Sequence, residues 1–191
     1  AWTAALTFVT AVASALGAWA FRPVPVPPEM RLEITTPPTS DPVSFALSPD
    51  GQKIVFVATS EGHPRLWLRS LDSVSEQLLA ATDGAAFPFW SPDSRSVGFF
   101  ADNSLKRIDI SGGSAQILAR TSVARGGPWN RDGTILFAPS PTGPIFRVSA
   151  AGGQASPGTR VEAAQQGNHR YPQFLPDDEH FLYYVTGSPE V

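Results

Sequence analysis

Cysteine is absent from the 191-residue sequence, so neither disulfide bonds nor thiolate metal sites can form. Basic residues are also few: 14 Lys and Arg against 17 Asp and Glu give a net charge of −3, which argues against a nucleic-acid partner. Common enzyme motifs are missing as well, including G-x-S-x-G, H-E-x-x-H, a Gly-rich phosphate loop, H-R-D and D-F-G. The sequence therefore predicts that this chain has no catalytic site, no metal site and no cofactor.

Proline and glycine are abundant instead, with 19 and 16 residues. Both interrupt helices and favour turns, so this composition predicts many short strands joined by turns. Hydrophobic residues make up 42% of the chain, which is enough to bury a core. The expected fold class is all-β.

The first 21 residues, AWTAALTFVTAVASALGAWAF, contain no charged side chain. As a helix this run would be about 31 Å long, which matches the hydrocarbon core of a bilayer. Trp2, Trp19 and Phe21 lie near its ends, where interfacial aromatic residues belong. We expect one transmembrane helix over 1–21, and the spacing of Ala13 and Gly17 would let two such helices form a homodimer.

Two alternatives stay open for this segment. It could be a signal peptide, because Ala18-Trp19-Ala20 resembles a cleavage site, although no basic region precedes it. It could also be a buried helix of a soluble protein, although such helices usually carry a polar face. Residues 22–30 begin with RPVPVPP and predict an extended, semi-rigid linker, and RLEIT at 31–35 then alternates as a strand does.

One phrase recurs in the rest of the chain, as ALSPDG, FWSPDS, PWNRDG and QFLPDD. Its aspartates are separated by 43, 39 and 45 residues and are Asp50, Asp93, Asp132 and Asp177. A period of about 40–45 residues with several strands per repeat is typical of a β-propeller blade. Residues 31–191 are thus interpreted as part of a propeller in a fragment of a longer protein, with four-stranded blades at about 41–83, 84–123, 124–166 and a truncated 167–191.

The phrase itself has the chemistry of a hairpin turn. Proline presets the first central position, aspartate can accept a hydrogen bond from its own downstream backbone, and glycine tolerates a positive φ. The aromatic residue upstream, as in Trp90, Trp129 and Phe174, is expected to pack between neighbouring blades. A metal ring or a set of catalytic carboxylates is the alternative for the four aspartates, and the structural role is preferred because they recur with every repeat.

The repeats resemble the TolB-like, WD-related propeller repeat. FALSPDGQKIVFVA, RLWLRSLDS, FPFWSPDSRSVGFFADNSLKRIDISGG and HRYPQFLPDDEHFLYYV look like the sensor region of bacterial transmembrane serine/threonine protein kinases of the acidobacterial type. In that group a cytoplasmic kinase domain is followed by one membrane helix, a Pro-rich linker and a propeller. The resemblance implies a single-pass protein of the bacterial inner membrane whose propeller is extracytoplasmic (periplasmic).

Candidate ligand-binding residues lie in the loops that connect successive repeats. RTSVARGGP contributes Arg120 and Arg125, and QQGNHRYP contributes His169 and Arg170. In a propeller these loops gather at one rim, where guanidinium groups could hold an anionic ligand or an acidic peptide. Alternatively, Arg125 and Arg170 fix the loops by bonding backbone carbonyls.

The sequence therefore predicts a membrane-tethered propeller that binds a ligand or a protein partner as the sensor of a serine/threonine kinase. Two other functions stay open. One is a periplasmic TolB-like protein-binding scaffold that carries a signal peptide. The other is the propeller domain of a peptidase whose hydrolase domain lies elsewhere.

Overall fold

The computed structural model describes residues 31, 33–122, 126–162 and 167–187. The chain divides into two compact units, Ala1–Thr35 and Thr36–Val191, and all strands belong to the second. The expected membrane segment, 1–21, and the linker, 22–30, lie outside the described residues. In the segment 31–35, which is expected to be a strand, the described residues, 31 and 33–35, belong to no strand.

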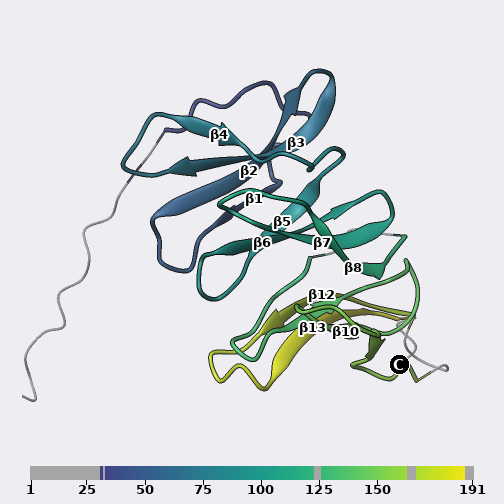
Figure 1. Ribbon diagram of the computed structural model, residues 1–191. Coiled ribbons are helices and arrows are strands. Elements are labelled where there is room, and N and C mark those ends of the chain that lie inside the picture. Colours follow the sequence, from purple (N-terminus) through teal and green to yellow (C-terminus); the bar gives the residue numbers. More distant parts are fainter. Residues whose placement is uncertain (1–30, 32, 123–125, 163–166, 188–191) are drawn as a thin grey trace, which may run out of the picture. The chain divides into compact units, whose positions relative to one another are not determined.

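The first two repeats each form a four-stranded antiparallel sheet in chain order (Figure 1). The first sheet contains β1 (Phe45–Leu47), β2 (Lys53–Ser60), β3 (His63–Ser70) and β4 (Glu76–Leu78). The second sheet contains β5 (Ala86–Trp90), β6 (Ser96–Ala101), β7 (Ser104–Asp109) and β8 (Gln116–Arg120). Each is an up-and-down meander, as expected for a propeller blade.

The third and fourth repeats form smaller sheets. The third contains β9 (Thr134–Phe137), β10 (Phe146–Ser149) and β11 (Ser156–Pro157), and a single bridge from Trp129 to Ile135 stands in place of a first strand. The fourth contains β12 (Asn168–Phe174) and β13 (Phe181–Thr186). The described residues thus form strands and no helix, which confirms the all-β prediction. None of their elements is a helix able to cross a bilayer.

Three hydrophobic clusters hold neighbouring sheets together. Two strands, β6 of the second repeat and β9 of the third, are buried on both faces and contribute to the clusters on either side. Side chains alternate along a strand, so Phe99 of β6 packs towards the first sheet, whereas Phe100 packs towards the third. In β9, Phe137 likewise joins the cluster shared with the second sheet, and Leu136 joins the cluster shared with the fourth. Double burial explains why these strands read as apolar runs, such as VGFFA and ILFA, rather than as alternating patterns.

Candidate binding groove at the first strands

The repeated phrase folds into a hydrogen-bonded turn in the first two repeats. The Ser48 hydroxyl donates to Asp50 Oδ1 at 2.5 Å and accepts the backbone N–H of Lys53 at 2.8 Å. Asp50 also accepts the backbone N–H of Gln52, and these two donors, with the serine hydroxyl the stronger, lower the pKa of its carboxyl group. The same bonds recur in the second repeat, where the Ser91 hydroxyl donates to Asp93 at 2.6 Å.

In the last two turns, different residues make the side-chain hydrogen bonds to the turn backbone. In the third, the Asn130 amide oxygen accepts the backbone N–H of Thr134 at 2.8 Å. In the fourth, Asp177 accepts two backbone N–H groups at 3.0 Å, and its other oxygen lies 2.8 Å from His180 Nδ1. The backbone and imidazole N–H groups of His180 and the N–H of Glu179 lower the pKa of Asp177 to about 2, and Asp177 in turn raises the pKa of His180.

The turn position with a positive φ is occupied by four residues, of which only two are glycine. Gly51 and Gly133 have φ values of 68° and 79°, but Ser94 and Asp178 hold the same conformation at 58° and 61°. Both non-glycine residues bond a neighbouring repeat. Ser94 Oγ accepts the backbone N–H of Asp50 at 3.2 Å, and the Asp178 carbonyl accepts the Asn130 amide at 2.9 Å. A bond between repeats is therefore present at both turn positions where a residue other than glycine has a positive φ.

These turns border a groove of about 530 Å³ that receives residues from the first strand or turn of all four repeats. Its lining is largely aromatic and proline-rich and includes Pro49, Phe89, Trp90, Trp129, Phe174 and Pro176. Trp90, predicted to pack between repeats, is 7% exposed, and its Nε1 donates to the Ala46 carbonyl of the first sheet at 3.0 Å. Phe174 makes an edge-to-face contact with Phe181, with ring centroids 6.2 Å apart.

The ring of Phe89 is held between two glycines in the wall of this groove. A Cβ atom added at Gly98 would lie 2.2 Å from Cζ of the ring, and one added at Gly127 would lie 2.3 Å from Cε1. Carbon atoms in contact are about 3.5–4.0 Å apart, so a side chain at either position would displace the ring. The absence of two side chains therefore positions Phe89 at the groove.

Three side chains supply polar groups to the groove. Trp129 Nε1 makes no hydrogen bond to the described residues, and this nitrogen is accessible to solvent. The amide of Gln173 is exposed and likewise makes no hydrogen bond to the described residues. The Asp178 carboxylate lies 3.3 Å from Arg131 Nε. The groove thus combines aromatic surface with two unused donors and one carboxylate.

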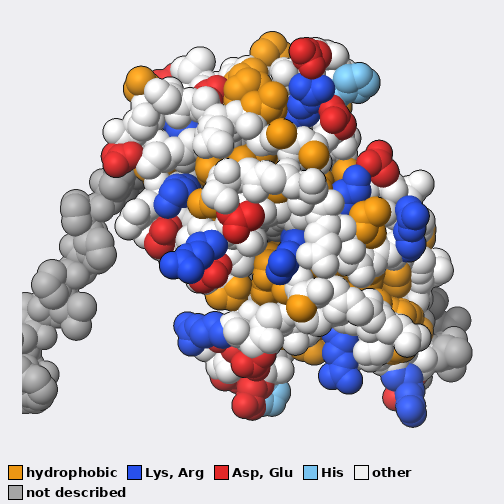
Figure 2. All heavy atoms as spheres, in the orientation of Figure 1, with side chains coloured by type: hydrophobic (Ala, Val, Ile, Leu, Met, Phe, Trp, Pro, Cys, Tyr) orange, Lys and Arg blue, Asp and Glu red, His pale blue; other side chains and the backbone are white. Residues whose placement is uncertain are grey.

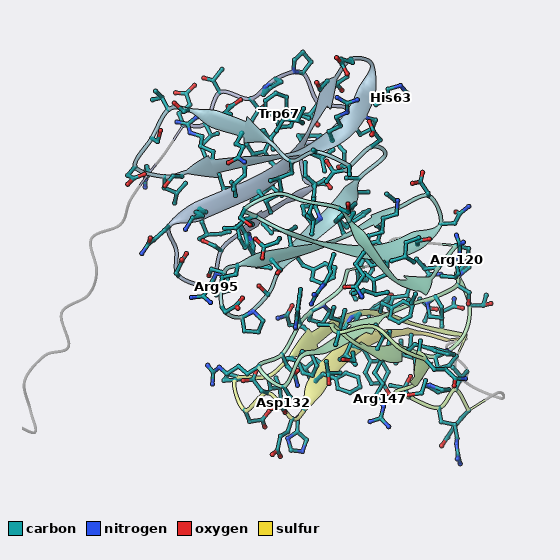
Figure 3. All side chains as sticks on the ribbon, in the orientation of Figure 1. His63, Trp67, Arg95, Arg120, Asp132 and Arg147 are labelled. Atoms are coloured by element: carbon teal, nitrogen blue, oxygen red, sulfur yellow. The ribbon has the colours of Figure 1, made fainter. Side chains whose placement is uncertain are left out.

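The residues predicted at the opposite rim have different environments. Arg120, which Figure 3 labels beside β8, donates to Ser104 Oγ at 3.2 Å. It borders a depression of about 350 Å³ together with Pro139. Arg170 donates to the Pro141 carbonyl at 3.1 Å, so the two arginines flank the β9–β10 hairpin. Arg125 lies outside the described residues.

His169 is 1% exposed, and its Nδ1 lies 2.8 Å from the Thr159 hydroxyl. Because that hydroxyl already accepts the Ile145 N–H, it can donate to the ring. Burial lowers the pKa of His169. This buried residue therefore joins the third and fourth repeats.

The turn aspartates are not gathered into a metal-binding group. Within the described ranges, no three His, Asp or Glu side chains are placed to hold one ion. Asp132 shows no side-chain hydrogen bond among the described residues, and Asn130 makes the corresponding contact in its turn. Asp50, Asp93 and Asp177 each bond the backbone of their own turn instead.

Comparisons with known proteins identify solved structures of similar fold. No protein-family model matches the chain, and no curated protein matches it. Among solved structures, TolB from Acinetobacter baumannii is similar with a TM-score of 0.64 and 18% identity over 78% of this chain and 38% of that one. A putative TolB from Agrobacterium tumefaciens is similar with a TM-score of 0.62 and 18% identity, over 77% of this chain and 55% of that one. The chain therefore has a TolB-like β-propeller fold and spans about half of those proteins or less.

Proposed function

We propose that this chain is a binding propeller that holds an extended segment of a partner protein in the groove at its first strands. The observation that carries the proposal is the convergence of all four repeats on one surface of about 530 Å³. Its aromatic side chains are of the types that dominate binding energy at protein interfaces. Burying one such side chain fully contributes about 1.5–3 kcal/mol, so a few contacts are enough for specific binding.

Trp129 and Phe174 are suited to anchor a partner because neither is fully buried within the chain. Phe89 is suited for another reason: its two glycine neighbours hold its ring in one position, so little conformational entropy is lost on binding. The groove is thus preorganised, in contrast to the opposite rim, where Arg120 and Arg170 already bond protein oxygens. An anionic ligand at that rim remains a secondary proposal, which rests on the depression beside Arg120.

We further propose that the propeller acts outside the cytoplasm as the sensor of a membrane-anchored serine/threonine kinase. The support is the order of sequence features: an apolar run over 1–21, a Pro-rich segment and then the repeats. Binding at the groove would change the position or dimerisation of the membrane segment. Deleting 31–191 from the parent protein should then abolish the response of kinase activity to the partner, and unchanged regulation would contradict this setting.

The binding function can be tested by site-specific photocrosslinking in cells that produce the parent protein. A photoreactive residue at Gln173, inside the groove, should give a discrete protein adduct that the additional substitution Trp129→Ala removes. The same residue at Ile117, which is 53% exposed on β8 and outside the groove lining, is the matched control. Equal adducts at both positions, or none at Gln173, would contradict a partner in the groove.

A further inference from the structure

The geometry points to a partner segment that is rich in proline, adopts a polyproline II conformation and carries a basic residue beside its prolines. This inference rests on the proposed binding function and specifies the partner of the same groove. Three observations carry it: the blocked edges of the first strands, the unused donors in the groove, and the charge of the turns that border it.

Two of the first strands, β5 and β12, are poor templates for an added β-strand. β5 and β12 are edge strands, since each pairs with only one neighbour in its sheet. Each contains a proline, Pro88 or Pro172, which has no N–H to donate. Each also has a register shift at that proline, which follows a residue with positive φ, Phe87 at 47° and Tyr171 at 50°. Bulges and prolines at an edge prevent continuous strand pairing, so side chains must provide the recognition.

The side chains in the groove offer donors and aromatic faces. Trp129 Nε1 and the Gln173 amide make no hydrogen bond to described residues, and both residues line the groove. A polyproline II segment has no internal hydrogen bonds, so its carbonyl oxygens are free to accept from such donors. Its proline rings pack on aromatic side chains, and its preformed conformation lowers the entropy lost on binding. An indole N–H beside exposed aromatic surface therefore fits a proline-rich segment better than a regular strand.

The charge of the surrounding turns favours a basic residue next to the prolines. The four turns at 48–53, 91–96, 130–134 and 175–180 contain six Asp and Glu side chains against three Lys and Arg. The fourth turn alone carries Asp177, Asp178 and Glu179, and Asp178 also lines the groove. Figure 2 shows acidic side chains grouped with a histidine at the lower edge of the described unit. A Lys or Arg at one end of the segment would meet this acidic border.

Binding of synthetic peptides to the full 191-residue chain tests the inference. The probe is the peptide RPPVPPVPP, measured by isothermal titration calorimetry beside a peptide in which every proline is alanine and another in which Arg is Glu. We expect the first peptide to bind at least tenfold more tightly than either control. Trp129→Phe keeps an aromatic ring but removes the donor, so it should weaken binding about three- to tenfold.

Trp67→Phe is the matched control, because Trp67 lies in β3 outside the groove lining and its Nε1 makes no hydrogen bond. It should leave the affinity unchanged. Gln173→Ala is a second test of whether a side-chain donor in the groove contributes to binding. Gln173 is exposed, so this substitution should have little effect on folding. Equal melting temperatures of the variants would show that the comparison concerns binding alone.

The outcomes separate the two proposals. If the proline and alanine peptides bind equally, or if Trp129→Phe and Trp67→Phe behave alike, the polyproline inference is wrong and the binding groove stands. If no peptide binds while crosslinks at Gln173 persist, the inference is again wrong and the partner has other chemistry. If neither peptides nor crosslinks are found, both the inference and the proposed function are wrong.

Discussion

Replacing Gly98 with alanine should destabilise the protein, because the new methyl group would overlap the ring of Phe89. The added Cβ would lie 2.2 Å from Cζ and 2.3 Å from Cε2 of that ring, well inside the contact distance of about 3.5–4.0 Å. The backbone of Gly127 also lies close to this ring, since a Cβ added there would be 2.3 Å from Cε1, so the room for the ring to shift is limited. Overlap of this kind costs about 1–3 kcal/mol.

The expected change in melting temperature follows from the size of the folded unit, Thr36–Val191. At about 2–4 °C for each kcal/mol in a domain of this length, Gly98→Ala should lower the melting temperature by about 2–12 °C. Reduced chain entropy in the unfolded state would offset about 0.4–1 kcal/mol of the cost, so the fall in melting temperature should lie in the lower part of this range. Thermal and urea unfolding followed by circular dichroism measure the change.

A double-mutant cycle with Phe89→Ala identifies the cause. In the Phe89→Ala background the overlap is gone, so Gly98→Ala should be nearly neutral, which gives a coupling free energy of about 1–3 kcal/mol. Gly158→Ala is the matched control, because its added Cβ would meet no atom closer than 3.5 Å. The reasoning is refuted if Gly98→Ala costs no more than this control, or costs the same without the phenyl ring.

Four further predictions concern hydrogen bonds and pH. Ser91→Ala removes the donor to Asp93 and leaves the partly buried backbone N–H of Ser96 without its acceptor, so we expect a loss of about 1–3 kcal/mol in urea unfolding. Because the pKa of His169 is lowered in the folded state, the unfolded chain takes up this proton at a higher pH than the folded chain does. The contribution of His169 to the free energy of unfolding should therefore be complete above pH 6.5 and decrease as the pH falls below it. His169→Gln should reduce this dependence of the free energy of unfolding on pH. The pKa of His180 is raised, so the contribution of this residue to the free energy of unfolding should be present below pH 6.5 and lost as the pH rises through the raised pKa. NMR titration of the wild type and of Asp177→Asn can measure this pKa. The Asp177 carboxyl should itself titrate near pH 2, with its stabilisation lost as pH falls from about 4 towards that value, and an NMR value near 3.8 would contradict the turn geometry.

The turns could be predicted from the sequence because their chemistry is local. An aspartate two residues before the N–H that it accepts needs no distant partner, and three of the four turn aspartates make this kind of bond. The all-β class was accessible for the same reason, since proline, glycine and the repeat period act within short windows. The sequence did not indicate that Ser94 and Asp178 would adopt a positive φ, because their compensating bonds come from other repeats.

The groove could not be predicted, because it depends on which atoms meet across repeats. Trp90 and Trp129 occupy the same place in the repeated phrase and were both assigned to packing. Only Trp90 finds a carbonyl for its indole nitrogen, at Ala46, and nothing within either phrase distinguishes the two. The clamp on Phe89 likewise depends on Gly98 and Gly127, which belong to different repeats. The apolar pattern of the sequence revealed the strands but not the surface that they form together.

The sharing of hydrophobic clusters between neighbouring sheets has a consequence for local opening of the chain. β6 contributes to clusters on both of its faces, so exposing its amides to solvent requires two interfaces to separate at once. β13 contributes to one interface only and exposes Leu182, Tyr184 and Val185. Amide hydrogen exchange should therefore be slowest in β6 and β9 and fastest in β13 and β4, with protection rising towards the middle repeats. Such a gradient would mean that these repeats open as nested cooperative units rather than independently.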